Sequence, residues 1–192
     1  SLINALTVDV EDYFHVSAFS NRICRKDWDK LECRVETNTD KLLMIFDQHQ
    51  VRGTFFVLGW VAERYPALIK RIHAAGHELA SHGYWHQLVY DLTPEEFAKD
   101  LQYSREAIAN ACGVEVIAYR APSFSITNKS FWAIDVLAEQ GFKIIGQCRR
   151  AVRHFCCFGQ HGRIRIGQRC HGRIVQQVEV LNVLLAHHAG AD

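Results

Sequence analysis

A regular alternation between short strand-like runs and amphipathic helix-like stretches constrains the fold more than any other feature of this chain. The strand-like segments are 4–10, 54–59, 78–80 and 114–119, and the helix-like segments are about 40–50, 66–76, 94–110 and 128–140. The apolar residues of 13–36 follow neither the helical period of 3.6 residues nor the strand period of two, and we expect a long loop with local turns there. Strands that alternate with helices through short connectors are typical of an α/β fold on a parallel sheet.

Capping residues locate several of the helix ends. Thr93 is expected to cap a helix that starts at Pro94, and Glu96 completes the pattern of a capping box. Thr39 or Asn38 is the expected cap of the first helix. Gly residues follow the predicted helices at their C-terminal ends, as is usual for helix stops.

The amino-acid composition of the sequence changes near residue 143. Residues 144–192, called the tail below, contain seven Arg and two acidic residues, and no Lys, Ser, Thr, Pro, Tyr or Trp. They are dominated by Gly, Arg, Gln, His, Cys, Val and Ile, and no helix cap or turn pattern is visible in them. We therefore expect one α/β domain over 1–143 and a poorly ordered tail over 144–192.

Three acidic side chains follow the first predicted strand. Asp9, Glu11 and Asp12 lie within four positions, and the two-residue period of a strand places Asp9 and Glu11 on one face. Three acids in four residues more often form a solvated loop than a site. Their position at the C-terminal end of a strand makes them candidates for a site.

Two histidines follow the third predicted strand at a spacing typical of metal ligands. His82 and His86 are four positions apart, so both imidazoles can reach one ion from a tight loop. A third ligand is expected from a carboxylate elsewhere in the chain, with open positions left for water and substrate. In a chain with 11 His this spacing also arises by chance, and His77 is expected to be structural.

The fourth predicted strand leads into Arg120, which is followed by Ala121 and Pro122. In a barrel of parallel strands the active site forms at the C-terminal ends of the strands. The acidic cluster, the histidine pair and Arg120 all fall at such ends, although an ordinary surface Arg before a turn is the alternative for Arg120.

These three motifs, taken in order, resemble the polysaccharide deacetylase family, the NodB-like carbohydrate esterases of family four. The stretch from Leu6 to His15 resembles the branch associated with exosortase and exopolysaccharide gene clusters. The resemblance covers about residues 4–143 and implies a distorted (β/α) barrel, incomplete here because the tail lacks the family's last motifs. It also implies hydrolytic removal of N-acetyl groups from amino-sugar residues of a polysaccharide.

The resemblance further implies roles for individual residues. Asp9 would be the general base, paired with Arg120, and His82 and His86 would bind a divalent metal such as zinc. The third ligand stays open between Glu11 and Asp12, with the strand period favouring Glu11, and Gly83 stands where many members carry Ser or Thr. The residues expected to contact substrate are Tyr84, Pro122, Ser123 and Phe124, with the backbone N–H after Pro122 steadying the oxyanion.

The tail departs from the family pattern. A late His that protonates the leaving amine is expected in this branch, and the Leu185-Ala186-His187 stretch matches it only superficially. We therefore predict a shifted reading frame after residue 143 and weak or absent activity. The alternatives are a metal-dependent amidohydrolase acting on small C–N bonds, and an inactive scaffold whose Arg-rich tail binds nucleic acid.

Composition narrows the remaining possibilities. The formal net charge of +1 gives no general argument for nucleic-acid or membrane binding, so no nucleic-acid partner is expected. Seven Cys at irregular spacings suggest reduced thiols rather than a disulfide framework. Neither a signal peptide nor a transmembrane segment is visible, and a cytoplasmic location is expected.

Overall fold

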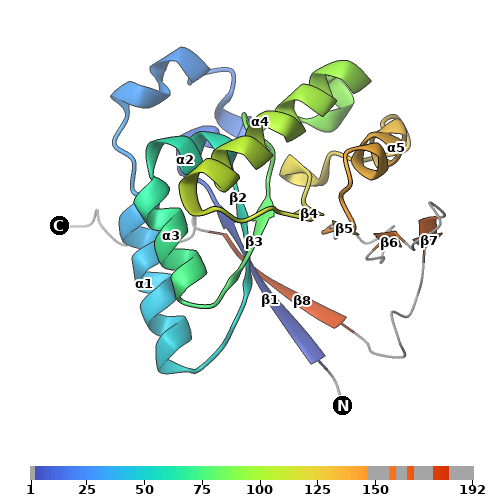
Figure 1. The fold of residues 1–192 in the computed structure, drawn as a ribbon. Helices are drawn as coiled ribbons and strands as arrows, with labels where there is room; N and C mark the ends of the chain where they lie inside the picture. The colour runs from blue at the N-terminus through green and yellow to red at the C-terminus, as the bar shows by residue number, and fades with distance from the viewer. Residues whose placement is uncertain (1–2, 147–155, 159–163, 167–174, 182–192) are drawn as a thin grey trace.

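The fold is a curled, mainly parallel sheet with helices packed against it (Figure 1). The computed structural model describes residues 3–146, 156–158, 164–166 and 175–181, and the side chains of residues 5–146. Five parallel strands lie in the spatial order β5-β4-β3-β2-β1. They are β1 (Ile3–Val10), β2 (Thr54–Val57), β3 (Glu78–Ser81), β4 (Ala118–Tyr119) and β5 (Ile144–Ile145). The predicted α/β fold of an incomplete (β/α) barrel is confirmed.

Among the residues that the structure describes, five α-helices connect and cover these strands. Figure 1 shows α1, α2 and α3 along one flank of the sheet, with α4 crossing toward α5 on the other flank. The α-helices are α1 (Val35–Gln48), α2 (Gly59–Arg64), α3 (Pro66–Ala74), α4 (Pro94–Cys112) and α5 (Trp132–Glu139). The short 3-10 helices are η1 (Tyr13–His15), η2 (Ser17–Phe19), η3 (Arg25–Lys30), η4 (Val89–Asp91) and η5 (Pro122–Phe124).

The capping box at the start of α4 is present as predicted. The Thr93 hydroxyl accepts a hydrogen bond from the Glu96 N–H at 3.2 Å, and the Glu96 carboxylate accepts one from the Thr93 N–H at 2.8 Å. At its other end α4 stops at Gly113, whose φ of 76° is the left-handed conformation that glycine adopts readily.

Three helix starts differ from the sequence prediction, and one of them is α5, which begins at Trp132 rather than near residue 128. Helix α1 begins at Val35, with Arg34 as an N-cap that makes no side-chain cap bond, and Thr39 is buried inside the helix. Residue Gly59, predicted as the end of a strand, instead begins α2. The Gly59 and Trp60 N–H groups donate to the carbonyls of Gly83 and Tyr84, so tertiary contacts replace a local cap.

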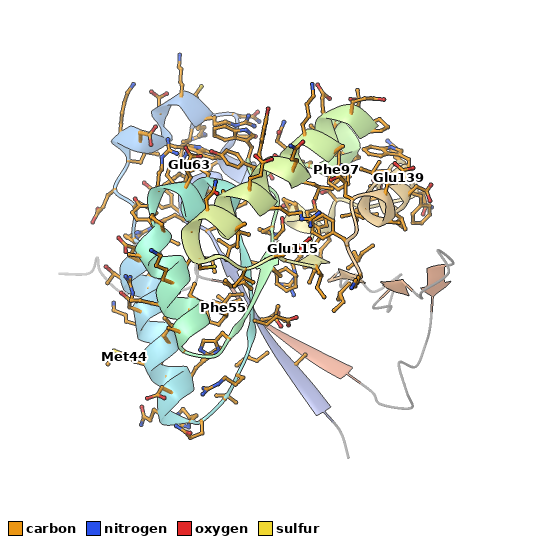
Figure 2. All side chains as sticks on the ribbon, in the orientation of Figure 1. Met44, Phe55, Glu63, Phe97, Glu115 and Glu139 are labelled. Carbon is orange, nitrogen blue, oxygen red and sulfur yellow. The ribbon has the colours of Figure 1, made fainter. Side chains whose placement is uncertain are left out.

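The core lies between the sheet and its covering helices. Phe55 of β2 and Phe97 of α4 are buried inside the ribbon, while Met44 of α1 points outward (Figure 2). The predicted loop 13–36 contains three 3-10 helices and is anchored by Trp28, which is buried against other aromatic rings. This aromatic packing gives the segment more order than its lack of period suggested.

Short strands extend the sheet at both edges. β8 (Val175–Leu181) runs parallel to β1, in register from Ile3 to Asp9, on the edge that a barrel without its last strands leaves open. β6 (Cys156–Phe158) and β7 (Ile164–Ile166) continue antiparallel beyond β5. The foreign origin of the tail stays a prediction, and residues 185–187 lie outside the described residues.

Two further findings concern the thiols and the helices of the described residues. Cys24, Cys33 and Cys112 are free thiols in the described part of the chain. Within the same residues, no helix is both long and apolar enough to span a bilayer.

Candidate metal centre

The candidate site forms where β1, β3 and β4 end on one edge of the sheet. Parallel pairing aligns Val10 with Val57, Val57 with Ser81, and Ser81 with Tyr119. The residues that follow these strands therefore emerge together. Polar side chains that the sequence separates by more than a hundred positions meet there, and most of them are buried.

Glu11, His82 and His86 form one compact cluster. Each offers one ligand atom, and these atoms all lie within 4.8 Å of one another. Glu11 Oε2 lies 2.9 Å from His86 Nε2 and 3.9 Å from His82 Nε2. Ligands about 2 Å from a tetrahedral ion lie about 3.3 Å apart, so this spacing is close to that of a metal site.

Backbone and side-chain contacts orient the two imidazoles. His82 Nδ1 donates to the Arg120 carbonyl oxygen at 2.9 Å, which leaves Nε2 unprotonated and facing Glu11. His86 has a left-handed backbone with φ of 53°, and its Nδ1 lies 3.5 Å from Ser17 Oγ. Such support of the second ring nitrogen is usual for metal-binding histidines.

The electrostatics of the cluster follow from burial and close charges. Burial would raise the pKa of Glu11, but the charge and close approach of His86, and then the charge of His82, bring the pKa to about 2. Burial lowers the pKa of His82. Burial acts in the same direction on His86, yet Glu11 outweighs it and raises the pKa of that ring. The cluster thus presents a carboxylate to two imidazoles.

These residues fit a divalent ion. Glu11 Oε2 is fully buried, and across the described residues it has no partner with hydrogen-bond geometry despite its short distance to His86. A buried carboxylate oxygen left in this state costs free energy that a bound cation would recover. Two imidazoles with one carboxylate form a donor set suited to zinc, with coordination positions left open.

Asp12 is outside this cluster. Its carboxylate accepts hydrogen bonds from the N–H groups of Tyr13 and Arg34, and it caps η1. The Arg34 guanidinium lies 3.7 Å from it. Of the two carboxylates left open by the sequence, the structure brings Glu11 to the histidines and places Asp12 against the loop backbone.

Asp9 and Arg120 form a buried ion pair beside the cluster. Arg120 Nη1 donates to Asp9 Oδ1 at 2.6 Å, and Nη2 donates to Thr7 Oγ1 at 2.9 Å. The guanidinium also lies over the Phe56 ring, with 4.0 Å from its carbon to the ring centroid. The other Asp9 oxygen is 4.0 Å from His82 Nε2, so Asp9 faces the cluster.

The segment after Arg120 forms the short helix η5. Pro122 is buried, whereas Ser123 is exposed and Phe124 is partly buried. Ser123 and Phe124 both have left-handed backbones, with φ of 51° and 53°. Non-glycine residues in this conformation are uncommon and are often found at functional sites.

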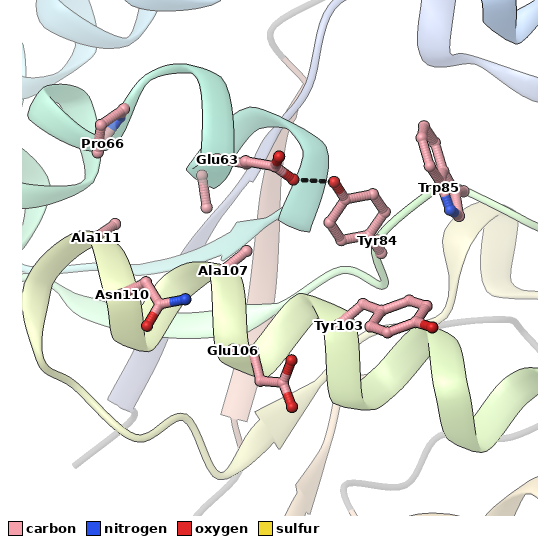
Figure 3. A pocket seen from close by; sticks show the side chains of 10 residues that line it. Glu63, Pro66, Tyr84, Trp85, Tyr103, Glu106, Ala107, Asn110 and Ala111 are labelled. Carbon is pink, nitrogen blue, oxygen red and sulfur yellow. Dashed lines mark hydrogen bonds between the residues drawn. The ribbon is translucent and has the colours of Figure 1, made fainter.

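Tyr84 lies in a separate pocket between α2 and α4 (Figure 3). The pocket has a volume of about 590 Å³, and the Tyr84 hydroxyl donates to the Glu63 carboxylate across it. Among the described residues, the lining of this pocket includes none of the cluster residues. The structure therefore does not bring the Tyr84 side chain together with Glu11, His82 and His86.

Sequence reasoning missed two residues near the site. His15 is buried, with Nδ1 accepting from the Asp12 N–H at 2.8 Å, and burial lowers its pKa to about 3. Asp100 is buried on α4 and contacts the loop between His82 and His86. Helical spacing could have found Asp100, since it lies three residues after Phe97 on the apolar face.

Comparison with known proteins shows which family the sequence matches. The sequence matches the family Polysaccharide deacetylase over residues 27–145. It is 32% identical over 108 residues to a peptidoglycan-N-acetylglucosamine deacetylase from Bacillus cereus, and 30% identical over 101 residues to a chitooligosaccharide deacetylase from Rhizobium leguminosarum bv. trifolii. These matches cover 56% and 53% of this chain, and 38% and 44% of those relatives, so the chain spans less than half of each.

Solved structures share the fold. A family 4 carbohydrate esterase pseudoenzyme from Bacillus anthracis superposes with a TM-score of 0.57 at 20% identity, over 74% of this chain and 42% of that one. Because the family match covers more than half of the sequence, the chain belongs to the polysaccharide deacetylase family.

Proposed function

We propose that this chain carries the metal centre of a zinc-dependent hydrolase that removes N-acetyl groups from amino-sugar residues of a polysaccharide. Glu11, His82 and His86 are the proposed ligands. The observation that carries the proposal is the buried Glu11 oxygen, which faces two imidazole nitrogens and has no hydrogen-bond partner in the described part of the chain. Asp12 is already engaged as a helix cap, which favours Glu11 as the third ligand.

The protein residues around the ion have separate tasks. A bound divalent ion supplies Lewis acidity, which lowers the pKa of water and polarises the acetyl carbonyl. Asp9 accepts the proton of the attacking water through the carboxylate oxygen that faces the cluster. Arg120 holds the other oxygen and thereby fixes the orientation of this base.

The substrate class comes from the family and its named relatives. The relatives are named for deacetylation of peptidoglycan N-acetylglucosamine and of chitooligosaccharides. We propose a β-linked N-acetylhexosamine polymer as substrate, with exopolysaccharide synthesis as its setting. Pro122, Ser123 and Phe124 are the proposed contacts beside the scissile amide, and the Ser123 N–H is the proposed oxyanion donor. Tyr84 is proposed to contact a more distant part of the glycan.

Turnover by the 192-residue chain is proposed to be slow. The leaving amine must gain a proton as the C–N bond breaks, and positioned acids typically accelerate such steps by about 10²–10⁴-fold. The family residue expected to donate this proton has no clear counterpart in the sequence. A fold relative that is a pseudoenzyme shows that this architecture also exists without activity.

Acetate release from an N-acetylated chitooligosaccharide tests the proposal. The purified 192-residue chain should release acetate slowly after zinc loading and stop after chelation. His82→Ala should abolish the release, whereas His73→Ala, an exposed histidine on α3, should leave it unchanged. Failure to bind zinc, or release that survives His82→Ala, would overturn the proposal. Activity on acetamide but not on the glycan would redirect it to small amides.

A further inference from the structure

We infer that Asp100 is a positioning residue that fixes the metal loop, defined here as residues 82–86, so that both histidines face one ion. The inference rests on the proposed metal site. Asp100 lies on α4 and is only 6% exposed. Its two carboxylate oxygens are used on the backbone of the metal loop.

The contacts divide evenly between the two oxygens. Asp100 Oδ2 accepts a hydrogen bond from the Tyr84 N–H at 2.9 Å, and Oδ1 accepts one from the Trp85 N–H at 3.1 Å. Two consecutive peptide groups between the ligands are thereby bound by one side chain. A buried carboxylate requires such donors, because an unpaired charge in the interior is costly.

Gly83 is fitted to this carboxylate. Its φ of 77° is left-handed, and a Cβ added there would lie 2.7 Å from Asp100 Oδ2. A larger residue at position 83 would therefore push against Asp100 and strain its own backbone. Glycine at position 83 is therefore matched to the carboxylate of Asp100.

Other contacts hold the same loop from α2 and from β3. The Gly59 N–H donates to the Gly83 carbonyl at 2.9 Å. Ser81 Oγ accepts from the Gly83 N–H at 3.1 Å and lies 2.8 Å from Ser104 Oγ of α4. Helix α4 thus contributes Asp100 and, one turn later, Ser104 to one polar clamp around the metal loop.

The clamp predicts a specific effect on zinc binding. Removing a residue that orients the metal ligands without binding the metal itself typically lowers metal affinity 10–100-fold. Asp100→Asn keeps the volume but replaces one acceptor with an NH2 group, which cannot accept from a loop N–H. We expect about tenfold weaker zinc binding, measured by competition with a chromophoric chelator on the full chain.

Three readouts separate positioning from general support of the fold. Zinc affinity should fall, the visible spectrum of the cobalt-loaded protein should change, and the Tyr84 and Trp85 amides should exchange hydrogen faster. The hydrogen exchange of the α4 amides should change much less, and so should the melting temperature. Glu95→Gln, an exposed acid on the same helix, is the matched control and should leave every readout unchanged.

The possible outcomes each decide the question. If Asp100→Asn folds, binds zinc within twofold of the parent and gives the same cobalt spectrum, the inference is overturned. If it does not fold, Ser104→Ala takes its place, with about threefold weaker zinc binding expected and an unchanged affinity overturning the inference. If the parent chain binds no zinc, the proposed function fails, and amide exchange alone still decides whether Asp100 restrains residues 84 and 85.

Discussion

Strand β3 carries a buried histidine next to each end, and the two histidines have opposite surroundings. His77 precedes the strand, and its Nδ1 accepts a hydrogen bond from the Gly53 N–H at 3.2 Å. Its ring packs against Phe46 and Phe55, and burial lowers its pKa. His82 follows the strand and turns its Nε2 toward carboxylates. The histidine at the N-terminal end of the strand therefore packs in the core, and the histidine at the C-terminal end faces the acidic side chains of the candidate site.

The difference arises from what the neighbouring strands deliver at each end. At the N-terminal end the chain supplies one backbone donor, the Gly53 N–H, and the apolar rings of Phe46 and Phe55. At the C-terminal end it supplies the carboxylates of Asp9 and Glu11, which lie near the His82 ring. In barrels of parallel strands the C-terminal face commonly carries function and the opposite face carries stability. A histidine alone predicts neither role.

Replacing each histidine with alanine should give the largest difference between the two ends of β3, one variant losing zinc affinity and the other losing stability. His82→Ala should weaken zinc binding by at least about 100-fold, because one of three protein ligands is lost. His77→Ala should leave zinc binding intact and lower the free energy of unfolding by about 2–3 kcal/mol through lost packing and an unpaired Gly53 N–H. Chelator competition and urea unfolding measure the two quantities. Equal effects on zinc from both variants would contradict the comparison.

Arg120→Gln should separate orientation of the base from metal binding. Without the guanidinium, Asp9 loses its 2.6 Å partner, and deacetylation should slow by about 100-fold. Zinc binding should persist, since the Arg120 carbonyl that orients His82 belongs to the backbone. Acetate release and zinc affinity are measured on the same samples, with Arg71→Gln, an exposed ion-pair partner on α3, as control. Loss of zinc without loss of stability would count against this division of roles.

Neighbouring acids at the end of β1 sharpen the comparison further. Glu11→Gln should weaken zinc binding by about 10–100-fold. Asp12→Asn should keep zinc binding and lower the free energy of unfolding by about 1 kcal/mol, because a helix cap and its bond to the Arg34 N–H are weakened. If Asp12→Asn instead loses zinc, the assignment of Glu11 as third ligand is wrong.

A smaller effect is expected from His15 in acid. Burial lowers its pKa to about 3, below the value of 6.5 for an exposed imidazole. The unfolded chain therefore binds the extra proton first, and stability from this residue is complete above pH 6.5 and is lost as the pH falls toward 3. In zinc-free protein, His15→Gln should flatten the dependence of unfolding free energy on pH in this window. An unchanged slope would show that His15 is not the titrating group.

Much of the fold could be predicted from the sequence, because its signals are local. The alternation of strand and helix, the capping box at Thr93 and the delivery of His82 and Arg120 at strand ends each depend on nearby residues. The start of α2 could not be predicted, since its first N–H groups are satisfied by the distant Gly83 and Tyr84 carbonyls.

Parts of the candidate site could not be predicted from neighbouring residues in the sequence, because they also depend on distant contacts. The choice between Glu11 and Asp12 depends on Arg34, which is brought to Asp12 by the fold of the intervening loop. The role of Asp100 depends on the approach of α4 to the metal loop. The place of the Tyr84 side chain, which lines the α2–α4 pocket, depends likewise on the packing of its ring over Gly59.

Anomalous diffraction at the zinc edge from crystals of the zinc-loaded chain tests the central claim most directly. The account predicts a single strong peak about 2.0–2.2 Å from a Glu11 carboxylate oxygen and from the Nε2 atoms of His82 and His86. A peak at Asp12, a peak elsewhere in the molecule, or no peak at full zinc loading would contradict it.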